Sequence, residues 1–317
     1  MENQQEKSEI LFWYDSTYSI PNGDPFTGEQ RYDDETKRIL VSDVRIKRFI
    51  RDYFIQQNEI EKDKYDIYVF NDKSQIAEGS KESGSSARMK SLRVKYKCEK
   101  LDKKKPEEEA LNLIKHCIDV RLFGGISTEK DAAVNITGPV QFALLNPSMN
   151  KIDLRIHQNT SVFSSSADKS GGAIGTTTVV PYALNQIHGW INPYSAKNSG
   201  LTTEDVQEMF KALWNSINNA NTRSKSNQNS VLLLQIVYHT PNDKLYGVDK
   251  LVTITSEKEE EQIRGMADFQ FDFNGLKAVV DSPKVKEVRF YTEIESIKNA
   301  LLALGNEKIK SIDIFTK

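Results

Sequence analysis

Basic side chains are concentrated in two short stretches of this sequence, and both could bind phosphate groups. Residues 37–51 carry six basic side chains against one acid, Asp43, and residues 86–105 carry nine against two. Acidic side chains cluster elsewhere, at Glu107–Glu109 and Glu257–Glu261. The formal net charge is only −2, which is not typical of a generally basic nucleic-acid-binding domain. Segregated charge within a near-neutral total predicts one anionic partner and other surfaces that contact protein.

A second candidate site is the segment that leaves the end of a predicted helix at residues 121–125. Its adjacent glycines, Gly124 and Gly125, allow a backbone to approach a phosphate or a sugar closely. Arg121 could supply positive charge, and Phe123 could stack on a base. The same residues also fit a C-terminal glycine cap with a buried phenylalanine, so both interpretations stay open.

Carboxylates in predicted loops raise the alternative of metal-dependent phosphodiester cleavage. Asp24 and the run Asp33–Glu35 lie near the basic stretch and could hold Mg²⁺. No fixed element places two of these carboxylates together, however, and Asp24 within Pro-Asn-Gly-Asp-Pro has an ordinary turn role. The four histidines lack metal-ligand spacing, and the cysteines, Cys98 and Cys117, are too few for a disulfide framework. We therefore predict no catalytic residue, no metal ligand and no cofactor.

A helix predicted to begin after Ser42 would position most of the basic side chains. Ser42 is a favourable N-cap, and Asp43 in the first turn complements the helix dipole. Apolar residues then recur at helical spacing and form one stripe, made of Ile46, Phe49, Ile50, Tyr53 and Phe54. Four cations fall largely off this stripe and are expected to project outward without disturbing the core: Arg45, Lys47, Arg48 and Arg51.

The remaining elements interleave strands with helices. Strands are expected at 10–14, 65–70, 138–145, 152–163, 176–182, 231–238, 250–255 and 285–291, and helices at 106–119, 202–219 and 293–304. Residues 72–105 have weak periodicity and indicate an exposed insertion, whereas the Gly- and Ser-rich segment 164–175 indicates the tip of a protruding hairpin. Short antiparallel-type connections favour an α+β fold. Arg223 and Lys225, beyond the helix at 202–219, either bind an anion or offset the helix dipole.

The bulk composition indicates a globular chain without a membrane span. With 317 residues and 38% apolar content, the chain can form one large or two ordinary domains around a substantial core. No run approaches the roughly 18 apolar residues that a membrane helix requires, and the first ten residues do not resemble a signal peptide. We therefore expect a cytoplasmic protein with no membrane partner.

Five motifs in chain order resemble the signatures of the Cascade backbone proteins of CRISPR systems, the Cas-seven group of the RAMP superfamily. They are Pro21–Pro25, Leu40–Tyr53, Asp119–Gly124 with Thr137–Phe142, Val180–Leu184 with His188–Gly189, and Asn221–Ser224. The resemblance spans roughly residues 9–240; the type I-B branch is the more similar, and type I-C comes second. Residues after about 245 match no motif of the group.

The resemblance implies an α+β fold in which a modified RRM-like (ferredoxin-like) palm carries inserted fingers and a protruding thumb β-hairpin. Residues 1–317 would form a single multi-lobed unit. Its parts would be a palm at about 8–70, 106–156 and 180–317, fingers at about 72–105 and a thumb hairpin at about 157–180. Lys169 is the only cation between Gln158 and Gly175, so the contribution of the thumb tip is expected to be steric.

The resemblance also implies a non-catalytic subunit of a type I surveillance complex that polymerises along the guide RNA (crRNA) and supports hybridisation with target DNA. Its partners would be the guide RNA, the target DNA strand, other copies of itself and other Cascade subunits: the large subunit, the subunit that caps the guide 5′ end and the guide-processing endonuclease. The implied RNA-binding residues are Asn22, Gly23, Arg45, Lys47, Arg48, Arg51, Arg121, Phe123, Gly124, Gly125, Gln141, Arg223 and Lys225. The implied thumb residues are Phe163, Lys169, Gly171 and Gly172.

One alternative function stays open. Relatives in type III complexes resemble this fold and cleave RNA with a loop aspartate. The alternative is therefore a RAMP-type metal-dependent endoribonuclease, with Asp24 or Asp33 in that role.

Overall fold

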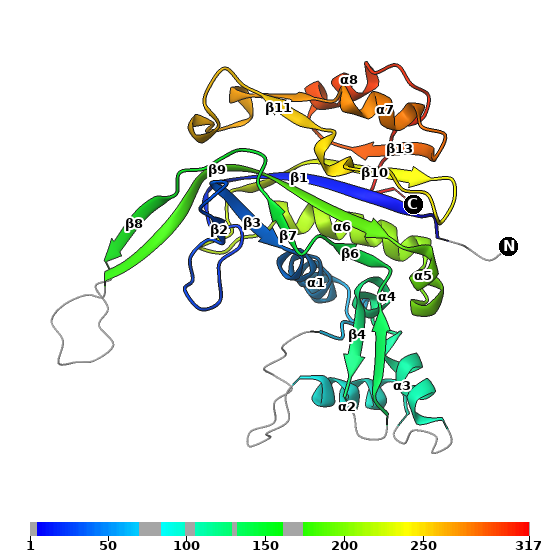
Figure 1. Ribbon diagram of the computed structural model, residues 1–317. Coiled ribbons are helices and arrows are strands. Elements are labelled where there is room, and N and C mark those ends of the chain that lie inside the picture. The colour runs from blue at the N-terminus through cyan, green and yellow to red at the C-terminus, as the bar shows by residue number, and fades with distance from the viewer. Residues whose placement is uncertain (1–4, 70–83, 99–104, 129–131, 161–173, 317) are drawn as a thin grey trace, which may run out of the picture.

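A central antiparallel sheet organises the computed structural model, which describes residues 5–69, 84–98, 105–128, 132–160 and 174–316 (Figure 1). The strand order is β14-β13-β10-β1-β9-β6, and β8 pairs with β9 outside this path. All pairs in this sheet are antiparallel except β13 with β14. The strands are β1 (Ser8–Ser19), β6 (Val140–Phe142), β8 (Arg155–Thr160), β9 (Ile174–Ile191), β10 (Gln228–Tyr238), β13 (Val285–Tyr291) and β14 (Ile309–Ser311).

The two middle strands, β1 and β10, are buried on both faces, as their near-continuous apolar runs predict. Ile10 and Phe12 belong to the core on one face of the sheet, and Leu11 and Trp13 to the core on the other. The strands predicted at 10–14 and 231–238 are therefore confirmed, and both extend beyond the predicted bounds.

Helices α1 (Asp43–Ile60) and α6 (Thr203–Asn218) cover one face of the sheet (Figure 1). Both begin as the sequence predicts. The Ser42 side chain accepts a hydrogen bond from the backbone of Arg45, and Thr202 with Asp205 forms a reciprocal capping box. Along the chain, β1, α1, β6, β9, α6 and β10 form a β-α-β-β-α-β unit with strand order β10-β1-β9-β6.

The residues after about 245, which contain none of the five motifs, cover the opposite face of the sheet and extend it (Figure 1). They comprise the 3₁₀ turns η2 (Val248–Lys250), η3 (Glu260–Gln262) and η4 (Met266–Asp268), the paired strands β11 (Thr253–Thr255) and β12 (Gln270–Asp272), helices α7 (Gly275–Asp281) and α8 (Glu295–Leu302), and strands β13 and β14. The strand predicted at 285–291 is confirmed. The strand predicted at 250–255 begins instead as η2, and the helix predicted at 293–304 is shorter.

A smaller lobe with its own apolar core lies on the far side of α1 (Figure 1). It contains α2 (Ser85–Lys95), α3 (Pro106–Ile114), α4 (Ile118–Phe123) and the hairpin of β4 (Gly124–Ser127) with β5 (Val134–Thr137). The sequence predicts one helix over 106–119, but the chain breaks there into α3 and α4.

One prediction in this lobe is wrong, and the structure adds a helix to a second. Residues 65–69 form no strand and make only an isolated bridge between Asp66 and Cys117. The described part of the predicted exposed insertion contains α2, which buries Met89 and Leu92 against α3 and the β4–β5 hairpin. Its weak apolar periodicity arises because only these two side chains of α2 are buried.

Strands β8 and β9 form an arm that projects from the sheet (Figure 1), as the sequence predicts for a protruding hairpin. The predicted tip residues Phe163, Lys169, Gly171 and Gly172 lie outside the described residues. A small sheet of β2 (Tyr32–Asp33), β3 (Arg38–Ser42) and β7 (Leu145–Pro147) lies beside the arm, and α5 (Pro193–Ser199) follows β9. Within the described ranges, no helix is long and apolar enough to cross a bilayer.

The smaller lobe joins the sheet at a point where the backbones of Gly124 and Gly138 lie in close contact. A Cβ on Gly138 would lie 2.1 Å from the carbonyl carbon of Phe123. We expect Gly138→Ala to lower the free energy of unfolding by about 2–3 kcal/mol, because backbone cannot move aside as a flexible side chain can. Urea unfolding would measure the change. The matched control is Gly265→Ala, since no atom lies within 4 Å of its added Cβ. Equal stability of both variants would contradict the prediction.

Candidate nucleic-acid interface

The cations of α1 do not share one role. Arg51 donates from Nε to Asp119 Oδ2 over 2.8 Å, and the Asp119 side chain is fully buried. Lys47 pairs with Asp43 at 3.2 Å and donates to Oε1 of Gln141 at 2.8 Å. The expectation that all four cations project outward is therefore wrong for Lys47 and Arg51, whose charges are matched by partners within the chain.

Two further basic side chains just before α1 are matched in the same way. Lys37 pairs with Glu261 at 3.4 Å, and Arg38 pairs with Glu260 at 2.9 Å. Residues 260 and 261 belong to η3, so part of one acidic cluster of the sequence neutralises part of the basic stretch. Fewer of the cations in residues 37–51 are consequently available to bind an external anion than the composition of this stretch indicates.

Arg45 and Lys225 differ from these paired cations. They line a cavity of about 330 Å³ between α1, the C-terminal end of α6 and residues 219–225. No ion pair within the described part of the chain involves either side chain, although Lys225 Nζ donates to the backbone oxygen of Ile20. Arg45 lies over the Phe49 ring at 3.7 Å, and its buried Nε has no hydrogen-bond partner among the described residues. The carboxylate of Asp52 also lines the cavity, but it pairs with Arg48 at 2.6 Å, so neither Arg45 nor Lys225 has an ion-pair partner in the described structure. Two such cations in a concave site would favour an anion.

Burial without an ion-pair partner shifts the pKa values of both cations. Burial, with a smaller contribution from the charge of Arg45, lowers the pKa of Lys225 to about 8. Burial likewise lowers the pKa of Arg45, and burial raises the pKa of the nearby Tyr14 hydroxyl, which also lacks a hydrogen-bond partner in the described structure. A bound phosphate would stabilise both cations in their charged forms.

Two further cations and two amide side chains lie at or near the rim of the cavity. Arg48 is exposed at the rim, where its Nε donates to Asp52 at 2.6 Å, and Arg223 is exposed in the turn that forms one wall. Asn219 and Asn221 complete the polar wall. Sequence reasoning did not assign these two asparagines, although the polar run from Asn219 onward was a usable signal.

The segment at 121–125 is structural in this conformation. Arg121 pairs through Nη2 with Asp205 at 2.6 Å, and the Phe123 ring is only 7% exposed. Gly124 has a φ of 85°, and Gly125 packs against side chains of the smaller lobe. The structure therefore contains the glycine cap with a buried phenylalanine, and RNA binding by this segment stays a prediction.

The loop after β1 also has local structural tasks. Asn22 Oδ1 accepts hydrogen bonds from the backbone nitrogen and the hydroxyl of Ser42, both at 2.7 Å, so it fixes the start of α1. Neighbouring Gly23 makes an isolated bridge to Gln30. Gln141 links β6 to the crossing of Gly124 and Gly138, because its Nε2 donates to the oxygen of Gly138 at 3.0 Å.

The two aspartates of the nuclease alternative are engaged in turns. Asp24 Oδ1 accepts from the backbone nitrogen of Phe26 at 2.9 Å, and Asp33 Oδ2 accepts from the hydroxyl of Thr36 at 2.7 Å. These hydrogen bonds are the main reason that the pKa values of both carboxyl groups are lowered. In the parts of the chain that the structure describes, no group of three or more acidic, histidine or cysteine side chains could hold a metal ion.

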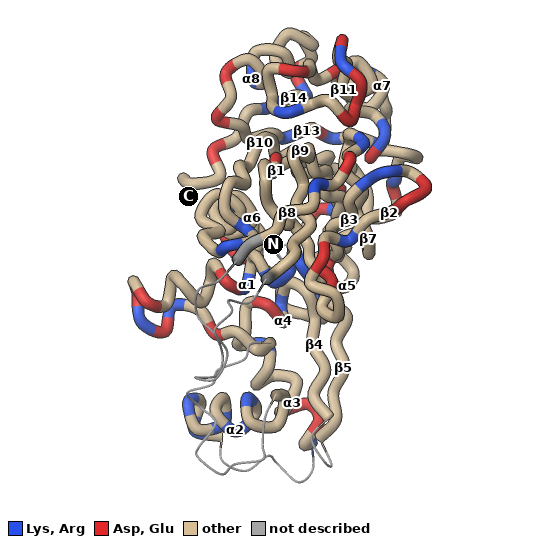
Figure 2. Tube along the Cα trace, turned by 90° about the vertical axis from the view of Figure 1, so that its left-hand side faces the viewer, with Lys and Arg blue, Asp and Glu red and all other residues tan. Residues whose placement is uncertain are grey.

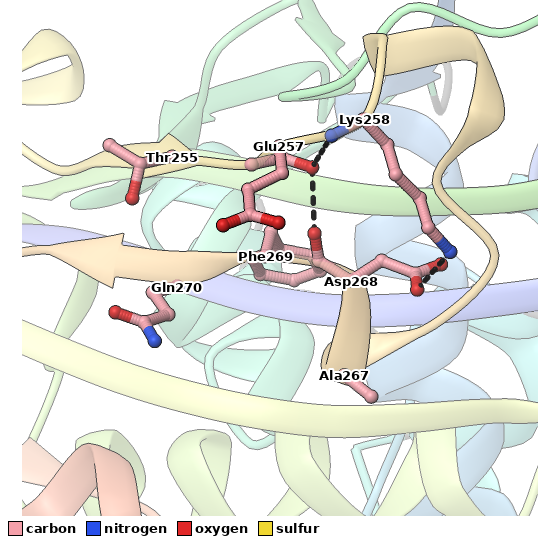
Figure 3. Close-up of a pocket in the computed structure, with 8 residues that line it drawn as sticks. Thr255, Glu257, Lys258, Ala267, Asp268, Phe269 and Gln270 are labelled. Carbon is pink, nitrogen blue, oxygen red and sulfur yellow. Dashed lines mark hydrogen bonds and ion pairs between the residues drawn. The ribbon is translucent and has the colours of Figure 1, made fainter.

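A larger cavity of about 460 Å³ lies between the ends of β11 and β12 (Figure 3). The figure shows Lys258 and Asp268 pointing toward each other, and they pair at 2.6 Å. Because its cation is already neutralised, this cavity is a weaker candidate for an anion than the cleft of Arg45 and Lys225. Figure 2 shows additional Lys and Arg residues along α2, away from both cavities.

Comparison with known proteins identifies the class. The model of the family described as CRISPR-associated protein Cas7 matches residues 6–274, and the chain therefore belongs to this family. A curated Haloferax volcanii protein named CRISPR-associated protein Cas7 is 26% identical over 291 residues, which are 85% of this chain and 81% of that protein.

Solved structures add that the fold is shared. A chain of a "CRISPR RNA-guided surveillance complex, pre-nicking" has a TM-score of 0.52 at 13% identity, and the match covers 97% of this chain and 96% of that one. A chain of a "CRISPR RNA-guided surveillance complex" has a TM-score of 0.51 at 13% identity, with 97% and 94% covered. At this identity the two matches establish similarity of fold alone.

Lys225 should make stability depend on pH with a defined sign. Its folded-state pKa of about 8 lies below the roughly 10.4 of an unfolded lysine. Between these values the unfolded state binds more protons, so stability rises with pH. We expect Lys225→Met to be more stable than the wild type at pH 7, by on the order of 1 kcal/mol after allowance for partial exposure, and this difference to shrink toward pH 10. Urea unfolding at several pH values would measure it.

The exposed Lys277 of α7 supplies the matched control, Lys277→Met. The same pH dependence of stability for both variants would show that Lys225 is not held as an uncompensated charge.

Proposed function

We propose that this chain is a non-catalytic, guide-RNA-binding backbone subunit of a type I CRISPR surveillance complex. The observation that carries the proposal is the cleft in which Arg45 and Lys225 lack a carboxylate partner, on a chain of the Cas7 family. Copies of the chain would polymerise along the RNA and support hybridisation of the guide with target DNA. The subtype is proposed as I-B, with I-C as the second choice, and the compartment as the cytoplasm.

Phosphate recognition fits this role chemically. A subunit that coats guides of arbitrary sequence has to bind the backbone without reading the bases. Arg45 can present a planar guanidinium to a phosphate, and Lys225 can add a compact charge beside it. Exposed Arg48 and Arg223 at the rim would continue the path of the RNA. In this scheme Lys47, Arg51 and Arg121 support the site indirectly, because they fix the elements that border it.

The parts of the fold have matching proposed roles. The unit β1-α1-β6-β9-α6-β10 has the strand order of a ferredoxin-like fold, which supports its assignment as an RRM-like palm. The lobe around α2 would correspond to the fingers, and the β8–β9 arm to the thumb. Other Cascade subunits, namely the large subunit, the guide 5′-end cap subunit and the guide-processing endonuclease, would contact the ends or flanks of the assembly.

A nuclease of the same superfamily is the runner-up. It requires an aspartate that is free to hold a metal ion or a water molecule. Asp24 and Asp33 are only partly exposed, and their turn hydrogen bonds would have to break before either could serve in this way. We therefore rank the non-catalytic function first.

RNA binding should depend on the cleft in a sequence-independent way. We expect Arg45→Ala/Lys225→Met to weaken binding of every RNA sequence to a similar degree. The slope of log affinity against log salt should fall by up to about two units, because up to two phosphate contacts are lost. Fluorescence anisotropy with two unrelated RNA sequences at several salt concentrations would measure both effects.

The control for this variant is Lys250→Ala/Lys277→Ala, which removes two exposed cations on the opposite side of the sheet. It should leave both quantities unchanged. An equal loss of affinity in the control would mean that general charge, not the cleft, binds RNA.

Assembly and the absence of cleavage can be tested together. With saturating guide RNA the wild type should form a multi-copy particle, and RNA recovered after incubation with Mg²⁺ or Mn²⁺ should be intact. Light scattering coupled to size exclusion would give the mass, and a denaturing gel would give the RNA length. A strict monomer on the RNA would refute polymerisation, and cleavage lost in Asp24→Ala or Asp33→Ala would establish the runner-up.

A further inference from the structure

Tyr18, near the end of β1, has a backbone conformation that tyrosine rarely adopts. Its φ is 46°, in the left-handed region, where the Cβ of an L-residue crowds the following carbonyl oxygen. Glycine or asparagine would occupy this position at lower energetic cost. A bulky residue held in such a conformation is an outlier that is often associated with a functional site.

Hydrogen bonds on both sides force this conformation. Thr17 donates from its backbone nitrogen to the oxygen of Asn227 at 3.0 Å, and Asn227 Nδ2 donates back to the oxygen of Thr17 at 3.1 Å. Ile20 donates to the oxygen of Ser224 at 2.8 Å. Asn227 has a φ of 60° itself, so two left-handed residues face each other where β1 meets the turn before β10.

The side chain of Tyr18 is left available by this arrangement. It is 67% exposed, whereas the next residue, Ser19, is buried. Among the described residues, no hydrogen bond or ring contact of the Tyr18 side chain is present. The fold thus holds an aromatic ring in solvent at a position where a smaller residue would be less strained.

The position of Tyr18 relates it directly to the cationic cleft. Two residues later, the oxygen of Ile20 accepts the hydrogen bond of Lys225 Nζ. On the other edge of β1, Ser19 pairs with Val180, next to the residue at which the β8–β9 arm begins its pairing. Tyr18 therefore stands between the Lys225 turn and the base of the arm.

We propose that the ring of Tyr18 is a stacking platform for one nucleobase of the RNA whose phosphate occupies the cleft of Arg45 and Lys225. This inference rests on the proposed RNA-binding function and adds a contact to a base. Stacking accepts any base, since every base has an aromatic face, so it is compatible with guides of arbitrary sequence. The partly exposed polar neighbour Thr17 and the cation of Lys225 nearby favour a nucleic acid over an apolar protein surface.

The test compares stability with binding. Tyr18→Asn should raise the melting temperature, because asparagine tolerates the left-handed backbone, yet weaken binding of oligoadenylate by about tenfold. Binding of the matching abasic oligonucleotide, which has phosphates but no bases, should not change. Tyr18→Phe should bind both as the wild type does, since stacking needs no hydroxyl. Tyr246→Asn is the control, because Tyr246 is 96% exposed on the segment before η2.

The outcomes separate the two proposals. A wild type that binds neither oligonucleotide refutes the proposed function. A wild type that binds RNA, with Tyr18→Asn weakened equally for the base-bearing and abasic forms or for neither, refutes stacking and leaves phosphate binding in place. Weakening confined to the base-bearing form, absent in Tyr18→Phe and Tyr246→Asn, supports the platform.

Discussion

Strand β1 is hydrogen-bonded along both edges, and this double pairing fixes every element that borders the cleft. Its pairing with β10, which reaches Ser16 opposite Gln228, places the turn that carries Lys225 beside the end of β1. Its continuation leads to Asn22, whose side chain receives two hydrogen bonds from Ser42 and thereby sets the start of α1. Arg45, three residues into that helix, is consequently positioned relative to the same strand as Lys225. A displacement of β1 would separate the two cations.

Charged side chains near the two ends of β1 differ in whether they have partners within the chain. Near the beginning, Glu9 is almost fully buried, and it receives hydrogen bonds from Tyr238, Trp190 and the ring of His188. Burial acts to raise the pKa of Glu9, but the hydrogen bonds of His188 and Tyr238 outweigh burial and lower it. Near the other end, Arg45 and Lys225 line a cavity in which the carboxylate of Asp52 pairs with Arg48 and with neither of these two cations. The hydrogen bonds of Glu9 show that this fold can compensate a buried charge, so the absence of an ion pair at Arg45 and Lys225 supports the proposed anion site.

Local sequence signals predicted the elements that depend on local physics. The Ser42 cap, the capping box of Thr202 and Asp205, and the apolar run of β10 are each readable within a few residues, and each prediction is confirmed. The strand expected at 65–70 fails because a remote residue intervenes: the Asp119 carboxylate accepts from the backbone nitrogens of Tyr68 and Val69, which a strand would have used for pairing. The sequence of residues 65–70 gives no indication of this remote carboxylate.

The difference between local signals and remote partners also applies to the candidate site. The sequence indicates which cations are available, but it does not indicate which of them lack an ion-pair partner in the fold. The basic stretch draws attention to α1, and the cations beyond the helix at 202–219 draw attention to Lys225, but partners far along the chain decide which cations stay unmatched. Arg51 is neutralised from α4, Lys47 is held from β6, and Arg38 is neutralised from η3. On one helix, positions 45 and 51 are equivalent in the sequence pattern, yet only the tertiary fold brings a carboxylate to one of them. Charge in a sequence therefore locates a candidate interface, whereas the pattern of charge compensation in the fold selects the side chains that can bind a ligand.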